Sequence, residues 1–443
     1  MSKIERIIMF EGGVETLDYF SRRMGQAFEA HGLLVFYFNL EDAASSVKKV
    51  KKFIQSGKTA IITFNFEGLE REEHIYDPVR GYVWQHFDIE IYNIAVDHPY
   101  FYDNRFVHLI EDDAIMPGLV KRYHHLSIDR KHQKYMRTFY PQFDEAGFLP
   151  LAGTRLDGKS TDTMVCDKIA KEIKAKDKSR DIIFTGNYTD LAFFDKYIYG
   201  INDEYAQFYI GMIDDLIANP YKTVEEIIIS HCNDEMGPQK LSDLRLPIHK
   251  TIFVDMYVRS YFRGKMVQTL ADAGFDIAVV GAGWETLPVK KPNRFTIIPQ
   301  TNSRRCLELI KDSRVSVNLM PWFKDGVHDR VFNSIINDTV SFTDGSGYLN
   351  EVLSDGEGVR YFDLENLSEK HNAYEKALPE SYMKYKQGKT GENDRSIEIV
   401  DSMKDLLSDY DRLDEMVLSG KEIVRAGHTW ADRAEKLIEW FMI

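Results

Sequence analysis

Residues 315–352 read VSVNLMPWFKDGVHDRVFNSIINDTVSFTDGSGYLNEV, and this stretch indicates the fold. Its apolar run Val315–Leu319 is typical of a buried strand, and Pro321–Gly326 predicts a loop. After the loop, apolar residues at helical spacing precede a second apolar run that begins at Val340: Val327, Val331, Phe332, Ile335 and Ile336. Strand, helix and strand in this order predict a parallel sheet covered by helices.

Similar apolar runs, interleaved with helical patterns, recur along most of the chain. In the first third they are Arg6–Phe10, Leu33–Asn39, Ala60–Phe64, Ile91–Val96 and Phe106–Ile110. In the remainder they are Asp181–Thr185, Ile277–Val280, Phe295–Ile298, Val315–Leu319, Val340–Thr343 and Val359–Phe362. The predicted fold class is therefore α/β, with two Rossmann-like doubly wound domains. Ligands of such sheets bind at the carboxyl ends of the strands, so we expect the domains to face each other across a cleft.

The join between the two series should lie near residues 149–178, where the chain is rich in turn residues and the strand rhythm stops. We predict an N-terminal domain over residues 1–170 and a C-terminal domain over residues 171–425. The second domain should carry a helical insertion at about residues 190–250. A final helix is expected over residues 426–443.

Composition excludes several classes of protein. The 56 Lys and Arg residues against 70 Asp and Glu residues give a net charge of −14, so we expect no nucleic-acid partner. The three cysteines, Cys166, Cys232 and Cys306, are too few and too far apart for a disulfide framework. We find neither a signal peptide nor an apolar run near the roughly 18 residues that span a bilayer. The expectation is a cytoplasmic protein without a transmembrane segment.

The helix predicted after Gly326 is a candidate anion site. It begins at the carboxyl end of the strand over residues 315–319, and Lys324, His328 and Arg330 are close by. Free backbone N–H groups, the helix dipole and nearby cations suit a diphosphate. The alternative is that His328 and Arg330 are only solvated polar residues of this helix.

The run HDRVFNSI…FTDGSGYLNEV…YFDLENL resembles the nucleotide-sugar-binding segment of GT-B glycosyltransferases. It is most similar to the bacterial CgeB-like, spore-maturation-type group with a glycosyltransferase group 1 C-terminal half. Residues 180–188, 256–284 and 428–440 fit the same pattern. The resemblance implies a metal-independent enzyme that moves a sugar from a nucleoside diphosphate sugar to an acceptor, which is a glycan, a protein or a small molecule. It needs no cofactor beyond that donor.

In this family the second domain holds the donor, the first supplies the acceptor side, and the C-terminal helix crosses back to the first domain. Asp325 and Asn333 occupy the places of two glutamates that retaining enzymes carry eight positions apart. Asn333 can hydrogen-bond ribose hydroxyls but has no charge, which leaves a retaining or an inverting outcome open. The resemblance implies the following donor-binding residues: Gly186, Arg259, Arg263, Gly281, Asp325, Gly326, His328, Arg330, Asn333 and Tyr348.

Two of these residues, Arg259 and Arg263, are expected to open the helix before the strand at Ile277–Val280. Similar enzymes place cations there against the leaving phosphates, where they stabilise the charge that develops as the glycosidic bond breaks. The alternative is a basic cluster, with Lys265, on the surface of an amphipathic helix.

The candidates for the catalytic base come from the first domain. Asp97 and His98 follow the strand predicted at Ile91–Val96, and Glu11 follows the first strand. A DHP strand end resembles the N-terminal half of the family, where it precedes an HLIEDD-like strand, here residues 108–113. Capping of the next helix by Asp97 is the alternative.

The sequence disfavours two other kinds of enzyme and leaves one non-enzymatic alternative. We expect no metal site, because no metal-ligand spacing occurs and a DxD pattern appears only at Asp409–Asp411, within a charged helical stretch. A dehydrogenase is disfavoured because GAGW at residues 281–284 lacks the third glycine of a dinucleotide fingerprint. A catalytically silent nucleotide- or glycan-binding protein on the same scaffold remains the main alternative.

Overall fold

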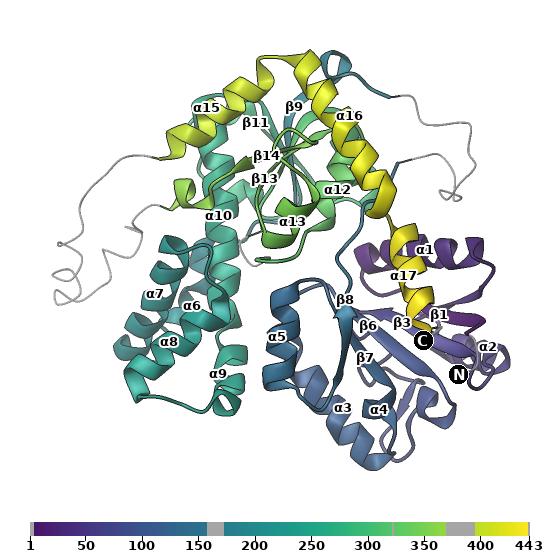
Figure 1. The fold of residues 1–443 in the computed structure, drawn as a ribbon. Helices are drawn as coiled ribbons and strands as arrows, with labels where there is room; N and C mark the ends of the chain where they lie inside the picture. Colours follow the sequence, from purple (N-terminus) through teal and green to yellow (C-terminus); the bar gives the residue numbers. More distant parts are fainter. Residues whose placement is uncertain (1–3, 157–171, 321–322, 369–394, 442–443) are drawn as a thin grey trace.

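Two six-stranded parallel sheets form the core of the computed structural model, which describes residues 4–156, 172–320, 323–368 and 395–441 (Figure 1). The first sheet has the order β2-β1-β3-β6-β7-β8. Its strands are β1 (Arg6–Glu11), β2 (Leu34–Asn39), β3 (Thr59–Phe64), β6 (Glu90–Ala95), β7 (Tyr123–Ser127) and β8 (Asp144–Phe148). A small antiparallel pair, β4 (Tyr76–Asp77) and β5 (Gly81–Tyr82), lies outside it.

The second sheet has the order β11-β10-β9-β12-β13-β14. Its strands are β9 (Arg180–Thr185), β10 (Ile277–Val280), β11 (Phe295–Ile298), β12 (Ser313–Asn318), β13 (Val340–Asp344) and β14 (Val359–Phe362). In both sheets the order reverses beside the first strand of the series, as in doubly wound folds. The predicted fold class is confirmed.

Helices cover both faces of each sheet because their apolar stripes match the buried strands. The first-domain helices are α1 (Glu15–Ala30), α2 (Ala43–Phe53), α3 (Asp103–Ile115), α4 (Leu119–Arg122) and α5 (Arg130–Phe139). Those of the second series are α6 (Asp195–Ile198), α7 (Asp203–Ala218), α8 (Val224–Met236), α9 (Arg245–Lys250), α10 (Ile252–Ala273), α11 (Ser303–Lys311), α12 (Asp329–Ile336), α13 (Gly347–Val352), α15 (Ser396–Leu407), α16 (Tyr410–Gly427) and α17 (Trp430–Phe441). None of the described helices is both long and apolar enough to cross a bilayer.

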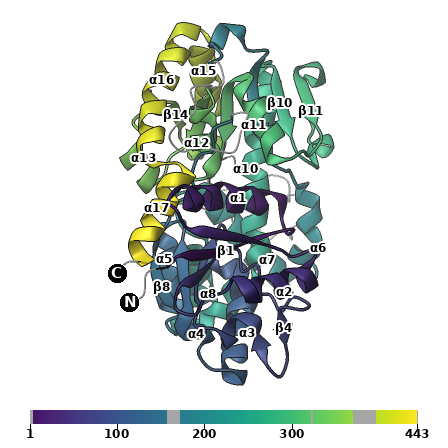
Figure 2. The same cartoon turned by 90° about the vertical axis from the view of Figure 1, so that its right-hand side faces the viewer.

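Two helical segments bridge the regions of the first and the second sheet. Helices α6 to α9 lie together beside α5, and α10 runs from them to the second sheet (Figure 1). The last helix, α17, leaves the second sheet and lies against α1 (Figure 2). Its Trp430 ring packs 4.8 Å from that of Phe20, which buries both side chains in the core of the first sheet.

One strand prediction is wrong. Residues 106–110 and the HLIEDD-like residues 108–113 lie in α3 and form no strand. The buried positions of this helix, Asp103, Phe106, Leu109 and Asp112, are spaced by three residues, which is helical spacing. Two strands of the first sheet, β7 and β8, were not predicted because YHHLS and DEAGF contain few apolar residues.

The linker between the sheets is fixed to the second one. Asn333 Oδ1 accepts a hydrogen bond of 2.7 Å from the Thr154 backbone N–H, and Asn337 donates to the Thr154 carbonyl at 2.8 Å. Asn337 Oδ1 also accepts from the Leu156 N–H at 2.6 Å. These two asparagines lie one turn apart around α12, so they hold successive peptide groups of the linker.

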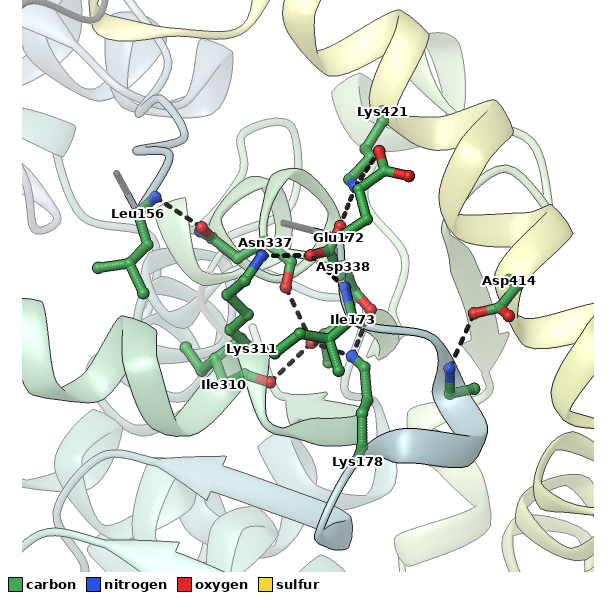
Figure 3. Close-up of polar contacts among 12 residues, drawn as sticks. Leu156, Glu172, Ile173, Lys178, Ile310, Lys311, Asn337, Asp338, Asp414 and Lys421 are labelled. Carbon is green, nitrogen blue, oxygen red and sulfur yellow. Dashed lines mark hydrogen bonds and ion pairs between the residues drawn. The ribbon is translucent and has the colours of Figure 1, made fainter. Parts of the chain in front are cut away.

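A buried carboxylate anchors the returning end of the linker (Figure 3). Asp338 pairs with Lys311 and Lys421, and its Oδ2 accepts from the Ile173 N–H at 3.3 Å. Lys178 lies beside it and donates to the Ser313 carbonyl at 2.8 Å. Asp338 adopts a positive φ of 71°, which aspartate tolerates better than most residues. The cluster therefore joins α11, α12 and α16 to the linker.

Candidate active site

The helix predicted as an anion site is α12, and its first turn lies at the carboxyl edge of the second sheet. His328 is the N-cap residue, and its Nδ1 lies 2.7 Å from the Asp329 carboxylate. The same Nδ1 lies 3.2 Å from the capping backbone N–H of Arg330, and Nε2 lies 3.2 Å from Arg330 Nη2. Arg330 Nη1 donates to Asn318 Oδ1, at the end of β12, over 2.8 Å. The buried guanidinium group is thus fixed by two neutral partners.

Two further arginines reach the same region from α10. Arg263 Nη1 donates to the Asn187 carbonyl at 3.0 Å, and Arg259 pairs with Asp255 at 2.7 Å. Burial, together with the positive charges of Arg330 and Arg259, lowers the pKa of Arg263 to about 9. We call Arg259, Arg263 and Arg330 the arginine cluster. Mutual repulsion of its charges favours the binding of an anion among them.

The place of the arginines on α10 differs from the prediction. They do not open this helix, which begins at Ile252 and places both arginines in its middle. The apolar residues before Arg259, including Val254 and Tyr257, are buried and extend the helix toward its N-terminus. The arginines therefore reach the site from the side of a helix, and the helix dipole contributes little there.

Gly186 and Gly281 lie where β9 and β10 end, next to the arginine cluster. A Cβ atom on Gly281 would lie 2.5 Å from the Gly186 carbonyl oxygen, and one on Gly186 would lie 3.6 Å from Arg330 Nη2. Both residues have φ near +150°, which disfavours side chains. The close approach of these loops leaves backbone as the wall of the site beside Arg330.

The loop before α12 contacts the first domain. Gly326 pairs with Asp129 in an isolated bridge, and the Asp325 N–H donates to Asp129 Oδ2 at 2.8 Å. Arg130 forms a bidentate pair with Glu351 of α13, with distances of 2.8 and 2.9 Å. The loop therefore joins the two sheets, and a donor role for Asp325 and Gly326 stays a prediction.

Asn333 and Tyr348 have partners within the chain. Besides holding Thr154, Asn333 donates to the Asp329 carboxylate at 2.8 Å. The Tyr348 hydroxyl lies 3.2 Å from His428 Nδ1, beside the junction of α16 and α17. Both side chains are buried, and their predicted donor contacts also stay predictions.

The three candidate bases of the first domain lie in different surroundings. Asp97 Oδ1 lies 3.3 Å from Arg259 Nη1 and so adjoins the arginine cluster. His98 is buried, stacks on Tyr100 at 3.9 Å, and has a pKa lowered by burial to about 3. Glu11 pairs with Arg22. Asp97 does not cap the next helix, since His98 Nδ1 accepts the capping N–H of Tyr100. A neutral histidine with so low a pKa is a weak base.

A cavity of about 440 Å³ opens beside Asp97, among the loops that follow β1, β3 and β6. It contains a residue that sequence reasoning missed, Glu67, which follows β3 within the run FNFEGLE. No spacing motif marks this glutamate. The available signal was its place after a strand whose six residues are all buried, since such strand ends carry ligand sites in doubly wound folds.

Buried histidines predict loss of stability in acid. Burial lowers the pKa of His98 and of His125 to about 3, and that of His132 well below its usual range. The unfolded chain, with pKa values near 6.5, takes up these protons first, so stability falls as the pH drops below about 6.5. We expect a loss of about 2 kcal/mol per histidine between pH 7.5 and pH 5 in urea unfolding.

His132→Phe is the matched variant for this test. His132 packs against Phe323, and neither of its ring nitrogens has a hydrogen-bond partner among the described residues. The substitution should reduce the pH-dependent loss by about 2 kcal/mol. Equal pH dependence of wild type and variant would contradict the assignment.

One segment of the chain matches a known protein family, and the whole chain aligns with solved structures. Residues 259–381, which contain the whole arginine cluster, match the family model described as glycosyl transferase-like. An alpha-glucosyltransferase solved with UDP-glucose and DNA containing an abasic site aligns over 100% of both chains, with 11% identity and a TM-score of 0.51. The chain has the GT-B glycosyltransferase fold.

Two further solved structures align with lower TM-scores. Sucrose-phosphate synthase from Thermosynechococcus elongatus aligns over 99% of this chain and 98% of its own, with 10% identity and a TM-score of 0.46. A glycosyltransferase from Rickettsia africae aligns over 100% and 98%, with 8% identity and a TM-score of 0.44. No curated protein matches this GT-B chain in sequence.

Proposed function

We propose that the protein is a CgeB-like glycosyltransferase that moves a sugar from a nucleoside diphosphate sugar to an acceptor held by the first domain. The observation that carries the proposal is the arginine cluster at the carboxyl edge of the second sheet. A diphosphate gains negative charge as the glycosidic bond breaks. Fixed cations beside it therefore stabilise the transition state more than the bound substrate.

The donor site is proposed to lie between the glycine loops and the first turn of α12. Gly186 and Gly281 permit close approach of a ligand to the backbone, and Arg330 supplies charge. Uridine is the first nucleoside to test, because the structural neighbour with a TM-score of 0.51 was solved with UDP-glucose.

A thermal-shift panel tests this function. Sugars linked to UDP, GDP, ADP and TDP are each added to the protein, together with the free diphosphates. We expect a rise in Tm with the sugars of one base and with its free diphosphate, since ligands that bind the native state stabilise it. Release of that diphosphate without added acceptor would favour an enzyme over a silent binding protein. The absence of any shift across the panel would count against a donor site.

Metal independence is part of the proposal. The arginine cluster supplies the charge that a divalent ion supplies in metal-dependent transferases, so EDTA should leave the rate nearly unchanged. The measurement is diphosphate release with and without chelator. Complete loss of activity in EDTA, restored by Mn²⁺ or Mg²⁺, would refute this part of the mechanism.

A further inference from the structure

The cavity beside Asp97 differs in character from the arginine cluster. Its walls carry four carboxylates and two aromatic rings: Glu67, Glu70, Glu72, Asp97, Phe101 and Tyr102. Asp97 also pairs with Arg259, so the cavity of the first domain adjoins the arginine cluster of the second. A molecule bound in the cavity would lie next to a diphosphate bound by the arginines.

Three of these carboxylates have partners within the chain. Glu70 pairs with Arg105, and Asp97 pairs with Arg259. Glu72 accepts hydrogen bonds of 2.6 and 2.8 Å from the backbone N–H groups of Gly68 and Glu70. Their charges are therefore committed to holding the walls of the cavity.

The carboxylate of Glu67 is less well hydrogen-bonded than the other three. Its side chain is buried, with 8% of the residue exposed, and within the described parts of the chain Oε1 accepts one long hydrogen bond, of 3.4 Å, from the Val14 N–H. Oε2 is buried and has no hydrogen-bond partner among the described residues. A buried carboxylate oxygen without a donor is costly, so Glu67 is suited to a ligand that supplies one.

The chain holds Glu67 in place at a cost in backbone conformation. Asn65 and Phe66, just before it, have φ values of 48° and 68°; asparagine tolerates such a value, but it is unfavourable for the bulky Phe66. The loop is fixed by a bond of 2.9 Å from the Phe66 N–H to buried Asn93 and by one of 2.7 Å from Thr63 Oγ1 to the Glu67 carbonyl. Strain kept by such bonds is common at functional sites.

We propose that this cavity binds a neutral, hydroxyl-bearing acceptor and that Glu67 is the base that accepts the proton of its reacting hydroxyl. The proposal rests on the proposed function. The hydroxyl oxygen bonds to the anomeric carbon, and its proton passes to Glu67 Oε2. The bond from that carbon to the diphosphate breaks, and its electron pair leaves with the diphosphate beside the arginine cluster. Phe101 and Tyr102 offer apolar surface to the carbon skeleton of the acceptor.

The protonation behaviour of Glu67 is compatible with this role. Burial, supported by the negative charges of Asp18, Glu70 and Glu72, raises its pKa to about 7. A base is most effective when its pKa lies near the working pH. The rate of wild type should therefore fall as the pH drops through about 7.

The test compares wild type with Glu67→Gln, Glu67→Asp and the control variant Glu111→Gln. Diphosphate release from the donor selected in the thermal-shift panel is measured from pH 5.5 to 9, with water, glucose, galactose and N-acetylglucosamine as acceptors. Binding of the free diphosphate is measured by calorimetry. Glu67→Gln should lower kcat about 10² to 10⁴-fold and remove the acid limb near pH 7, with Kd changed less than about twofold. Glu67→Asp should keep the limb at a reduced rate, and Glu111→Gln should turn over as wild type, because Glu111 lies outside the cavity and pairs with Arg71 at 2.8 Å.

Each contrary result has its own meaning. Normal turnover of Glu67→Gln, or a reduced rate with an unchanged pH limb, would overturn the role of Glu67 while leaving the transferase intact. A wild type that binds no diphosphate and consumes no donor would overturn the proposed function, and this inference with it. If Glu67→Gln does not fold, loss of the acid limb in Glu67→Asp overturns the proposal.

Discussion

Asp338→Asn is expected to lower the free energy of unfolding of the second domain by about 3 to 5 kcal/mol, because it removes the buried carboxylate from Lys311 and Lys421 and leaves Lys421 with the more exposed Glu172. The side chains of Lys421 and Asp338 are each only 4% exposed, and Lys311 pairs with the other carboxylate oxygen of Asp338. Asparagine tolerates the positive φ at this position, so the change removes charge and preserves the backbone.

Urea unfolding, followed by circular dichroism, measures this effect. Asp401→Asn is the matched control, since Asp401 forms an exposed pair with Lys404 at 3.1 Å. Exposed pairs contribute about 1 kcal/mol or less, so the control should unfold nearly as wild type. If both variants unfold alike, the cluster around Asp338 does not stabilise the linker as described.

Arg330→Gln is expected to weaken binding of the nucleoside diphosphate about 10- to 100-fold. Arg330 is buried at the first turn of α12, and its hydrogen bonds to Asn318 and His328 aim its charge at the site. A hydrogen bond to a charged group contributes about 1.5 to 3 kcal/mol, which corresponds to that range of affinity. Calorimetry with the diphosphate selected in the thermal-shift panel gives the change in Kd.

Arg314→Gln provides the control for this comparison. Arg314 lies near the amino-terminal end of strand β12, pairs with Asp181 at 2.8 Å, and is also largely buried, with 12% of its side chain exposed. Its loss removes a positive charge at the wrong end of the sheet for a donor. Unchanged affinity in Arg330→Gln, or an equal loss in both variants, would show that Arg330 does not hold the diphosphate.

Periodicity of apolar residues predicted the second sheet well. Residues 315–344 contain β12, α12 and β13 in the predicted order, because each of these elements buries a complete apolar face. The same reasoning failed at residues 106–110, where one short run fits a strand or a helix and only the spacing of its buried residues decides between them.

The site was less predictable than the fold because its geometry depends on contacts between distant segments. Arg259, Arg263 and Arg330 were named from the sequence, but their mutual repulsion arises only when α10 and α12 meet at one edge of the sheet. One partner of Asn333, Thr154, lies in the linker, and no local pattern indicates that contact. Glu67 was missed because burial and the absence of a donor, which single it out, are tertiary properties.

A crystal structure of the protein with its nucleoside diphosphate tests the central claim most directly. The account predicts the two phosphates at the carboxyl edge of the second sheet, within hydrogen-bond distance of Arg330 and Arg263 and against the backbone of Gly186 and Gly281. A diphosphate bound elsewhere on the molecule, with the arginine cluster unchanged and unoccupied, would contradict it.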